Sequence, residues 1–189
     1  MVTFLTFDDY WDYITILYER IPQYIVEIGL FLLIASIVFL WIRRDVSHRR
    51  KQVFGLWLFE YVFIIYGSTV LFRVTNCLSR VEVEPLRKYD GILTGKLFVF
   101  DPEMLMNILV FVPLGFLLGL TFKRLKWRGI LLTGFGISLS IEIIQYFLRR
   151  GTAEVDDLIH NTIGCFIGYG IFLLSKIIYT QLTDKVTDG

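Results

Sequence analysis

The sequence predicts an all-α integral membrane protein with five transmembrane helices and an N-terminal amphipathic interfacial helix. Hydrophobic residues make up 55% of the 189 positions, and the mean hydropathy is +0.61. Both values are high for a soluble domain. Five apolar runs come close to or reach the roughly 20 residues that cross a bilayer as a helix. The runs cover residues 24–42, 53–72, 105–122, 129–148 and 158–179.

The first 22 residues combine aromatic and acidic side chains. Apolar residues recur there at three- and four-residue spacing, at Phe4, Phe7, Trp11, Ile14, Tyr18 and Ile21. This spacing places them on one face of a helix that Pro22 ends. We expect residues 1–22 to form an amphipathic helix in the membrane surface. Residues 23–180 should then form the five-helix domain, and the polar residues 181–189 a disordered tail.

Basic residues in the short connections predict the orientation. Residues 43–51 carry five Lys or Arg, and residues 123–128 carry four. By the positive-inside rule both connections are cytoplasmic. The chain is therefore predicted to be a multi-pass protein of the cell membrane with its N-terminus outside and its C-terminus in the cytoplasm. Residues 73–104 and 149–157 then lie on the outer side.

Composition and spacing argue against several function classes. A net charge of +1 gives no reason to expect nucleic acid as a partner. The two cysteines do not form a C-x-x-C pair, and the two histidines are not at metal-ligand spacing. The sequence has no serine nucleophile motif and no glycine-rich phosphate loop. We therefore predict no metal site, and the cofactor is unknown.

Polar and small residues follow single helix faces in the last two spans. One face of the fourth span carries Gly134, Ser138, Glu142, Gln145 and Arg149. One face of the fifth carries Asp157, Asn161, Gly164 and Gly168. A short connection joins these spans, so they should be antiparallel neighbours. Gly164 and Gly168, like Gly115 and Gly119 of the third span, have the spacing that lets helices approach closely in lipid. The core is therefore predicted between spans three, four and five.

These faces predict a polar cluster at the outer ends of the three helices. Its ligand-binding candidates are Asn107, Glu142, Gln145, Arg149, Arg150, Asp156, Asp157 and Asn161. A carboxylate in hydrocarbon costs roughly 2.5–3.5 kcal/mol on insertion scales, so Glu142 should be paired, protonated or hydrated. Arg149 or Arg150 is its nearest candidate partner. Tyr66, Thr69 and Arg73, on the outer half of the second span, form a stripe that could close the cluster from the other side.

Three interpretations of this cluster stay open. It is a pocket for a lipid headgroup or amphiphile, or a structural clasp whose members satisfy one another. As a third alternative, the chain is a membrane-embedded lipid-phosphate or glycolipid enzyme. Carboxylates and a histidine would then hold a divalent cation, or supply a general acid and base while Arg149 and Arg150 bind the phosphate. That set would be Glu142, Glu154, Asp156, Asp157 and His160. A passive adaptor for another membrane protein would depend instead on the glycine faces. The sequence does not decide whether the chain is an enzyme.

Two further ionisable residues lie within the spans or at their ends. Glu60 is predicted some 10 Å from the cytoplasmic end of the second span, too deep to reach water easily. It is either neutral and hydrogen-bonded to a neighbouring helix or part of a pathway across the bilayer. Arg73 follows the outer end of the same span.

The second half of the chain carries a spaced polar motif. It has an Asn, a Phe-x-Pro-x-Gly-Phe, a Glu-x-x-Gln, an Arg-Gly, an Asp-Asp and an Asn-Thr-x-Gly-x-x-x-Gly-Tyr. The residues are Asn107, Phe111, Pro113, Gly115, Phe116, Glu142, Gln145, Arg150, Gly151, Asp156, Asp157, Asn161, Thr162, Gly164, Gly168 and Tyr169. With residues 83–86, segments 106–119 and 138–169 resemble the VanZ-like family of bacterial membrane proteins. The first two spans match that family only in general character.

The resemblance implies a function in the cell envelope. The family's named member lowers susceptibility to teicoplanin and related lipoglycopeptides, which bind outer peptidoglycan precursors and carry an acyl chain. By resemblance, the partners of this chain would be membrane lipids and a lipid-linked peptidoglycan precursor or the lipoglycopeptide itself. An outer polar cluster would lie in the compartment where these molecules meet.

Overall fold

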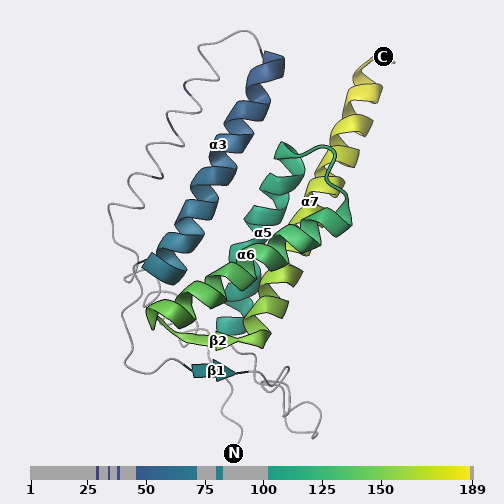
Figure 1. Cartoon of the computed structure of the whole chain (residues 1–189). Coiled ribbons are helices and arrows are strands. Elements are labelled where there is room, and N and C mark those ends of the chain that lie inside the picture. The colour runs from purple at the N-terminus through teal and green to yellow at the C-terminus, as the bar shows by residue number, and fades with distance from the viewer. Residues whose placement is uncertain are drawn as a thin grey trace, which may run out of the picture.

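A computed structural model describes residues 46–71, 80–82 and 102–187 and the single positions 29, 34 and 38. Its elements in chain order are α3 (Val46–Tyr66), the π-helix η1 (Gly67–Leu71), β1 (Arg80–Glu82), α5 (Pro102–Thr121), α6 (Trp127–Leu148), β2 (Thr152–Glu154) and α7 (Val155–Thr187) (Figure 1).

Four helices are long and apolar enough to cross a membrane. They cover Gln52–Leu71, Glu103–Thr121, Trp127–Leu148 and Val155–Asp184. These helices coincide with the second to fifth predicted spans to within a few residues at most ends. Large apolar side chains on the outer faces are exposed, as for Leu132 at 72% and Phe147 at 76%, which suits contact with lipid.

The first predicted span, 24–42, and the predicted interfacial helix, 1–22, lie outside the described residues except at three positions. Gly29, Ile34 and Val38 are helical. The five-span count with an added interfacial helix therefore stays a prediction.

Helix α7 is longer than its apolar run. It continues to Thr187, so the prediction that residues from 181 onward are disordered is wrong for 181–187. Extending an existing helix costs little compared with starting one, because each added residue gains one backbone hydrogen bond. Hydroxyls of the last turns, such as Thr183 Oγ1 to the Tyr179 carbonyl at 2.5 Å, bond back to the helix.

Helices α5 and α7 run parallel and in close contact, with α6 as the connection between them. A Cβ added to Gly168 would collide with the Val112 carbonyl oxygen, and one added to Gly164 with that of Ile108. From the other side, a Cβ on Gly115 would collide with the Cys165 carbonyl. Only glycine permits such backbone approach, which confirms the predicted close packing through both glycine pairs.

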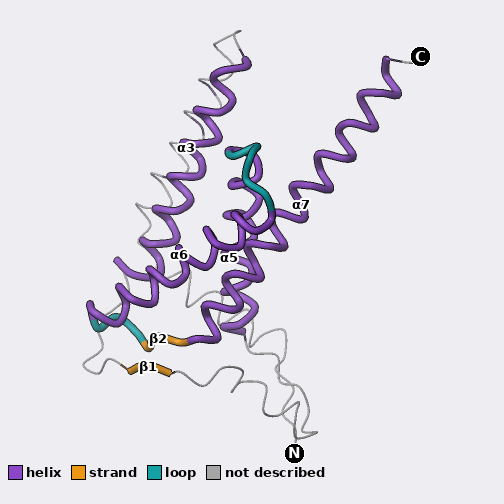
Figure 2. The backbone as a smooth tube through the Cα atoms, turned by 45° about the vertical axis from the view of Figure 1, so that its right-hand side comes forward, coloured by secondary structure: helices purple, strands orange, loops and turns teal. Residues whose placement is uncertain are grey.

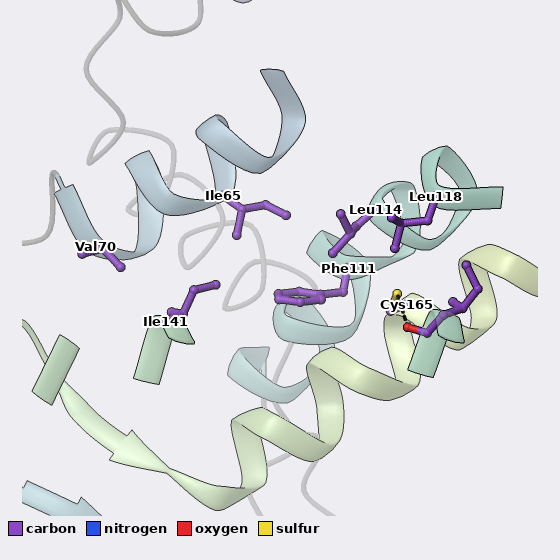
Figure 3. Close-up of a cluster of buried hydrophobic side chains, with 8 residues drawn as sticks. Ile65, Val70, Phe111, Leu114, Leu118, Ile141 and Cys165 are labelled. Atoms are coloured by element: carbon purple, nitrogen blue, oxygen red, sulfur yellow. Dashed lines mark hydrogen bonds between the residues drawn. The ribbon is translucent and has the colours of Figure 1, made fainter. Parts of the chain in front are cut away.

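Helix α6 crosses the α5–α7 pair obliquely (Figures 1 and 2). It runs antiparallel to α7, as predicted, and meets it where Gly134 faces Cys165. A Cβ on Gly134 would lie 2.8 Å from the Cys165 Sγ. That thiol also donates to the Ile130 carbonyl at 3.8 Å (Figure 3). Because the helices cross, only a short stretch of each lies in contact.

Helix α3 packs antiparallel against α5. The Tyr61 hydroxyl donates to the Val110 carbonyl at 2.7 Å, and Thr121 Oγ1 donates to the Phe54 carbonyl at 3.1 Å. Between these helices and α6 lies a buried apolar cluster (Figure 3). Its members are Ile65, Val70, Phe111, Leu114, Leu118, Ile130, Ile141 and Cys165.

A short sheet closes one end of the bundle. Strands β1 and β2 pair in parallel, with Arg80 opposite Thr152 and Glu82 opposite Glu154. The sequence predicted only connecting segments here, because three residues are too few for a visible alternation. We call this end, where η1 and α6 finish and α7 begins, the strand end. The opposite end, with the connection 122–126, is the loop end.

Candidate functional site

Polar side chains are buried together near the strand end. The buried polar and charged residues in the described part of the chain are Ser138, Glu142, Gln145, Asp156, His160 and Asn161. They come from α6 and α7, and their helix faces are those that the spacing predicts. Burial without water requires that each finds a hydrogen-bond partner, so their partners show how the cluster is built.

Two amides link the helices of the core. Asn161 Nδ2 of α7 donates to Ser138 Oγ of α6 at 2.9 Å, and both side chains are buried. Asn107 Nδ2 of α5 donates to Asp157 Oδ1 of α7 at 2.7 Å. The second bond includes a carboxylate acceptor and is the stronger kind. Together they connect α5, α6 and α7 at the predicted position.

Glu142 connects α6 to β2. Its Oε2 accepts a hydrogen bond from the backbone N–H of Glu154 at 3.0 Å. This carboxylate is 5% exposed, so a backbone donor compensates part of its lost hydration. The expected pairing with Arg149 or Arg150 is not the arrangement found, because the Arg150 guanidinium is directed to α3 and Arg149 is exposed.

Gln145 and Arg150 bind carbonyls of η1, the π-helix that continues α3. Gln145 Nε2 donates to the Thr69 carbonyl at 2.9 Å. Arg150 Nη1 donates to the Val70 carbonyl at 2.8 Å and also to the Leu71 carbonyl. Carbonyls at the end of a helix have no partner within it. These two side chains therefore satisfy groups that would be costly to leave bare near lipid.

The end of α3 is shaped by its own hydroxyls. Ser68 Oγ and Thr69 Oγ1 both donate to the Ile65 carbonyl, at 3.1 and 2.7 Å. Such back-bonding competes with the backbone ladder and bends helices, and here the last turn widens into η1. Tyr66, on the turn before, is hydrogen-bonded to Ser140 Oγ of α6. The predicted stripe of Tyr66 and Thr69 thus does face the cluster.

Arg149 and Arg150 have different environments although they are adjacent. Arg149 ends α6 in a left-handed conformation with φ 55°, and its side chain is exposed. Its backbone N–H bonds the Tyr146 carbonyl, and that of Arg150 bonds the Gln145 carbonyl. This cap turns the chain so that the side chain of Arg150 points back to α3. The buried Nε of Arg150 has no hydrogen-bond partner among the described residues.

Some of the remaining predicted residues are buried near the cluster, and others lie away from it or outside the described residues. Asp156 is buried and Asp157 half-buried, both in the first turn of α7. Glu60 lies on α3 with its Oε1 3.6 Å from where a Cβ would stand on Gly29, away from the cluster. Arg73 falls outside the described residues. His160, 1% exposed, belongs to the buried set; the sequence suggested it as a metal ligand or as part of an acid–base set.

The residues proposed for a divalent cation are not grouped as a ligand set within the described part of the chain. Within the described residues no three His, Cys, Asp or Glu side chains are grouped so as to hold a metal ion. Residues 156, 157 and 160 are on one helix, whereas the Glu142 carboxylate bonds a backbone N–H. The arrangement thus offers hydrogen-bond donors and single carboxylates rather than a shared coordination sphere.

Comparison with known proteins gives a consistent match. The family model described as VanZ/LLP1 matches residues 23–177. Protein VanZ of Enterococcus faecium is 36% identical over 74 residues, which are 39% of this chain and 46% of that protein. The match therefore spans about half the length of this curated relative. No solved structure matches the chain.

Proposed function

Since the chain belongs to the VanZ/LLP1 family, we propose that it is a cell-envelope membrane protein that lowers susceptibility to teicoplanin-type lipoglycopeptides. Its site is the polar cluster at the strand end, which the positive-inside rule directs outward. The ligand is an amphiphile or a lipid-linked envelope precursor with an anionic or hydrogen-bonding headgroup.

One observation carries the choice of ligand chemistry. The Nε–H of Arg150 is buried and lacks an acceptor among the described residues, while Nη1 of the same guanidinium binds backbone carbonyls. A buried donor left unmet is costly, and a guanidinium suits phosphate or carboxylate oxygens. The exposed Arg149 adds positive charge beside it. An oxygen-rich headgroup at the strand end would meet the exposed Arg149 first, and it would reach the buried Arg150 Nε–H only after the side chains that cover it move aside.

The same contacts divide the candidate residues by role. Asn161, Asn107 and Gln145 are engaged with protein groups at 2.9, 2.7 and 2.9 Å. These three residues hold together the helices that position the site, so in this proposal the structural clasp and the binding site coexist. Arg150 has both roles in this proposal, since its Nη1 binds carbonyls of η1 and its buried Nε–H has no acceptor among the described residues. Arg149 contributes positive charge from an exposed side chain.

The test is Arg150→Lys in a susceptible bacterial host. A single nitrogen of Arg150 contacts both carbonyls, so a lysine ammonium can replace that bond but supplies no Nε–H. We expect normal protein level and melting temperature in the membrane fraction together with a loss of lipoglycopeptide resistance. Arg124→Lys, the same change at an exposed position of the loop end, is the control.

Two results would contradict the proposal. Full resistance with Arg150→Lys would show that a headgroup contact with the Arg150 Nε–H is not needed for resistance. Resistance that follows protein level across variants of Arg150, Gln145 and Asn161 would mean that the cluster is a clasp alone.

A further inference from the structure

A groove lies on the side of the molecule where α6 begins. It has a volume of about 460 Å³, within the range of small-molecule sites. Its lining is almost wholly apolar and comes from Trp127 of α6 and from Phe166, Tyr169, Gly170 and Leu173 of α7. This groove faces the loop end, whereas the polar cluster is at the strand end, so the two sites are separate.

The walls of the groove are held in place by the core packing. Tyr169 stacks on Phe172 with ring centroids 6.0 Å apart, and Phe172 packs edge-on against Phe116 at 6.3 Å. A Cβ added to Gly119 would collide with the Phe172 ring, so that ring is fixed. The floor is Gly170, where an added Cβ would meet nothing within 4 Å. The groove is therefore a stable feature of the fold.

Positive charge borders the same groove. The Arg128 guanidinium carbon lies 5.2 Å from the Trp127 ring centroid, which places the cation over a wall residue. Lys176 follows Leu173 by three residues and so shares its side of α7, and it is exposed. An apolar groove with basic side chains at its border matches an acyl chain joined to an anionic headgroup.

We infer that this groove binds an anionic phospholipid of the surrounding bilayer, with an acyl chain in the groove and the headgroup at Arg128 and Lys176. A second copy of the chain fits less well. A two-fold contact would bring the same basic side chains of both copies together, and like charges oppose such an interface. A zwitterionic lipid would fill the groove but gain little from the two cations.

Tryptophan quenching by brominated lipids tests this inference. The protein is the full chain with Trp127 as its single tryptophan, after Trp11, Trp41 and Trp57 are changed to Phe. It is placed in phosphatidylcholine bilayers that contain either acyl-brominated phosphatidylglycerol or acyl-brominated phosphatidylcholine. We expect the relative association of the anionic lipid to be about fivefold higher, the factor expected from one basic side chain.

Substitutions distinguish lipid binding in the groove from lipid contact with the helix surface at large. Gly170→Leu should abolish the preference, because Gly170 lines the groove, a Cβ there has open space, and the larger side chain takes up room that the acyl chain needs. Gly136→Leu is the matched control, since a Cβ at Gly136 also meets nothing within 4 Å and this residue does not line the groove. Arg128→Gln with Lys176→Gln should make the two lipids equal while quenching persists.

Each opposing result is decisive. Equal quenching by both lipids in the parent protein would show that the groove does not select anionic lipid. Weak quenching by both, or an intermolecular cross-link from a cysteine at position 173, would show that protein covers the groove. Equal loss of preference in Gly136→Leu and Gly170→Leu would assign the effect to the helix surface at large. Each of these outcomes overturns the inference.

Discussion

One nitrogen of Arg150 donates to the backbone carbonyl of Val70 at 2.8 Å, although the two residues are 80 positions apart in the sequence. The bond joins the connection after α6 to η1, the π-helix that follows α3. With the Gln145 bond to the Thr69 carbonyl at 2.9 Å, it supplies side-chain donors to carbonyls of this π-helix. The charged side chain of Arg150 therefore has a structural role.

This contact predicts unequal effects of the two neighbouring arginines. Arg150→Gln should lower the free energy of unfolding by about 1–3 kcal/mol, because carbonyls near lipid lose a charged donor. Arg149→Gln should change it by less than about 0.5 kcal/mol, since the Arg149 side chain is exposed. Thermal denaturation in detergent, followed by intrinsic fluorescence, measures both. Equal losses would mean that the bonds from Arg150 to the Val70 and Leu71 carbonyls do not contribute to the free energy of unfolding.

The bond between Asn161 and Ser138 can be measured by a double-mutant cycle. Interhelical hydrogen bonds in membranes couple by about 0.6 kcal/mol on average, and by at most about 1.7 kcal/mol. Because both residues are buried, we expect a coupling near the upper value between Asn161→Ala and Ser138→Ala. Unfolding in mixed micelles would supply the four free energies. Strict additivity would show that each residue acts through other neighbours.

Glycines of α6 and α7 should differ sharply in their tolerance of one added methyl group. Gly164→Ala and Gly168→Ala place a Cβ against backbone carbonyls of α5, which cannot move without separating the helices. We expect a large fall in the yield of folded protein, visible as loss of the monodisperse peak in size-exclusion chromatography. Gly136→Ala on α6, with open space around it, is the control and should retain full yield.

The orientation can be tested at two exposed positions that lie at opposite ends of the bundle. In a version with Cys77→Ser and Cys165→Ala, a cysteine replacing Arg149 should react with a membrane-impermeant thiol reagent in intact cells. A cysteine replacing Lys126 should react only after the cells are opened, because the basic connection is predicted to be cytoplasmic. The reverse pattern would put the polar cluster on the cytoplasmic side and remove its proposed access to lipoglycopeptides.

The sequence was sufficient to predict the membrane spans and the helix faces. Crossing a bilayer requires about 20 apolar residues, and the second to fifth spans meet that length in the structure. Helical spacing alone also placed Ser138, Glu142 and Gln145 on one face, and Gly164 and Gly168 on another. These features depend on local composition and on the 3.6-residue period, which any reader of the chain can apply.

The partners of those faces were decided only by the tertiary structure. The period of a helix gives the direction of a side chain relative to its own axis, but not the tilt of that axis. Because α6 crosses the α5–α7 pair obliquely (Figure 2), its end reaches α3, and Arg150 binds backbone carbonyls there instead of Glu142. The pairing of β1 with β2 likewise joins backbone groups distant in sequence, and the Glu142 carboxylate accepts from the backbone N–H of Glu154. Every residue carries such groups, so nothing in the order of side chains marks which of them will meet.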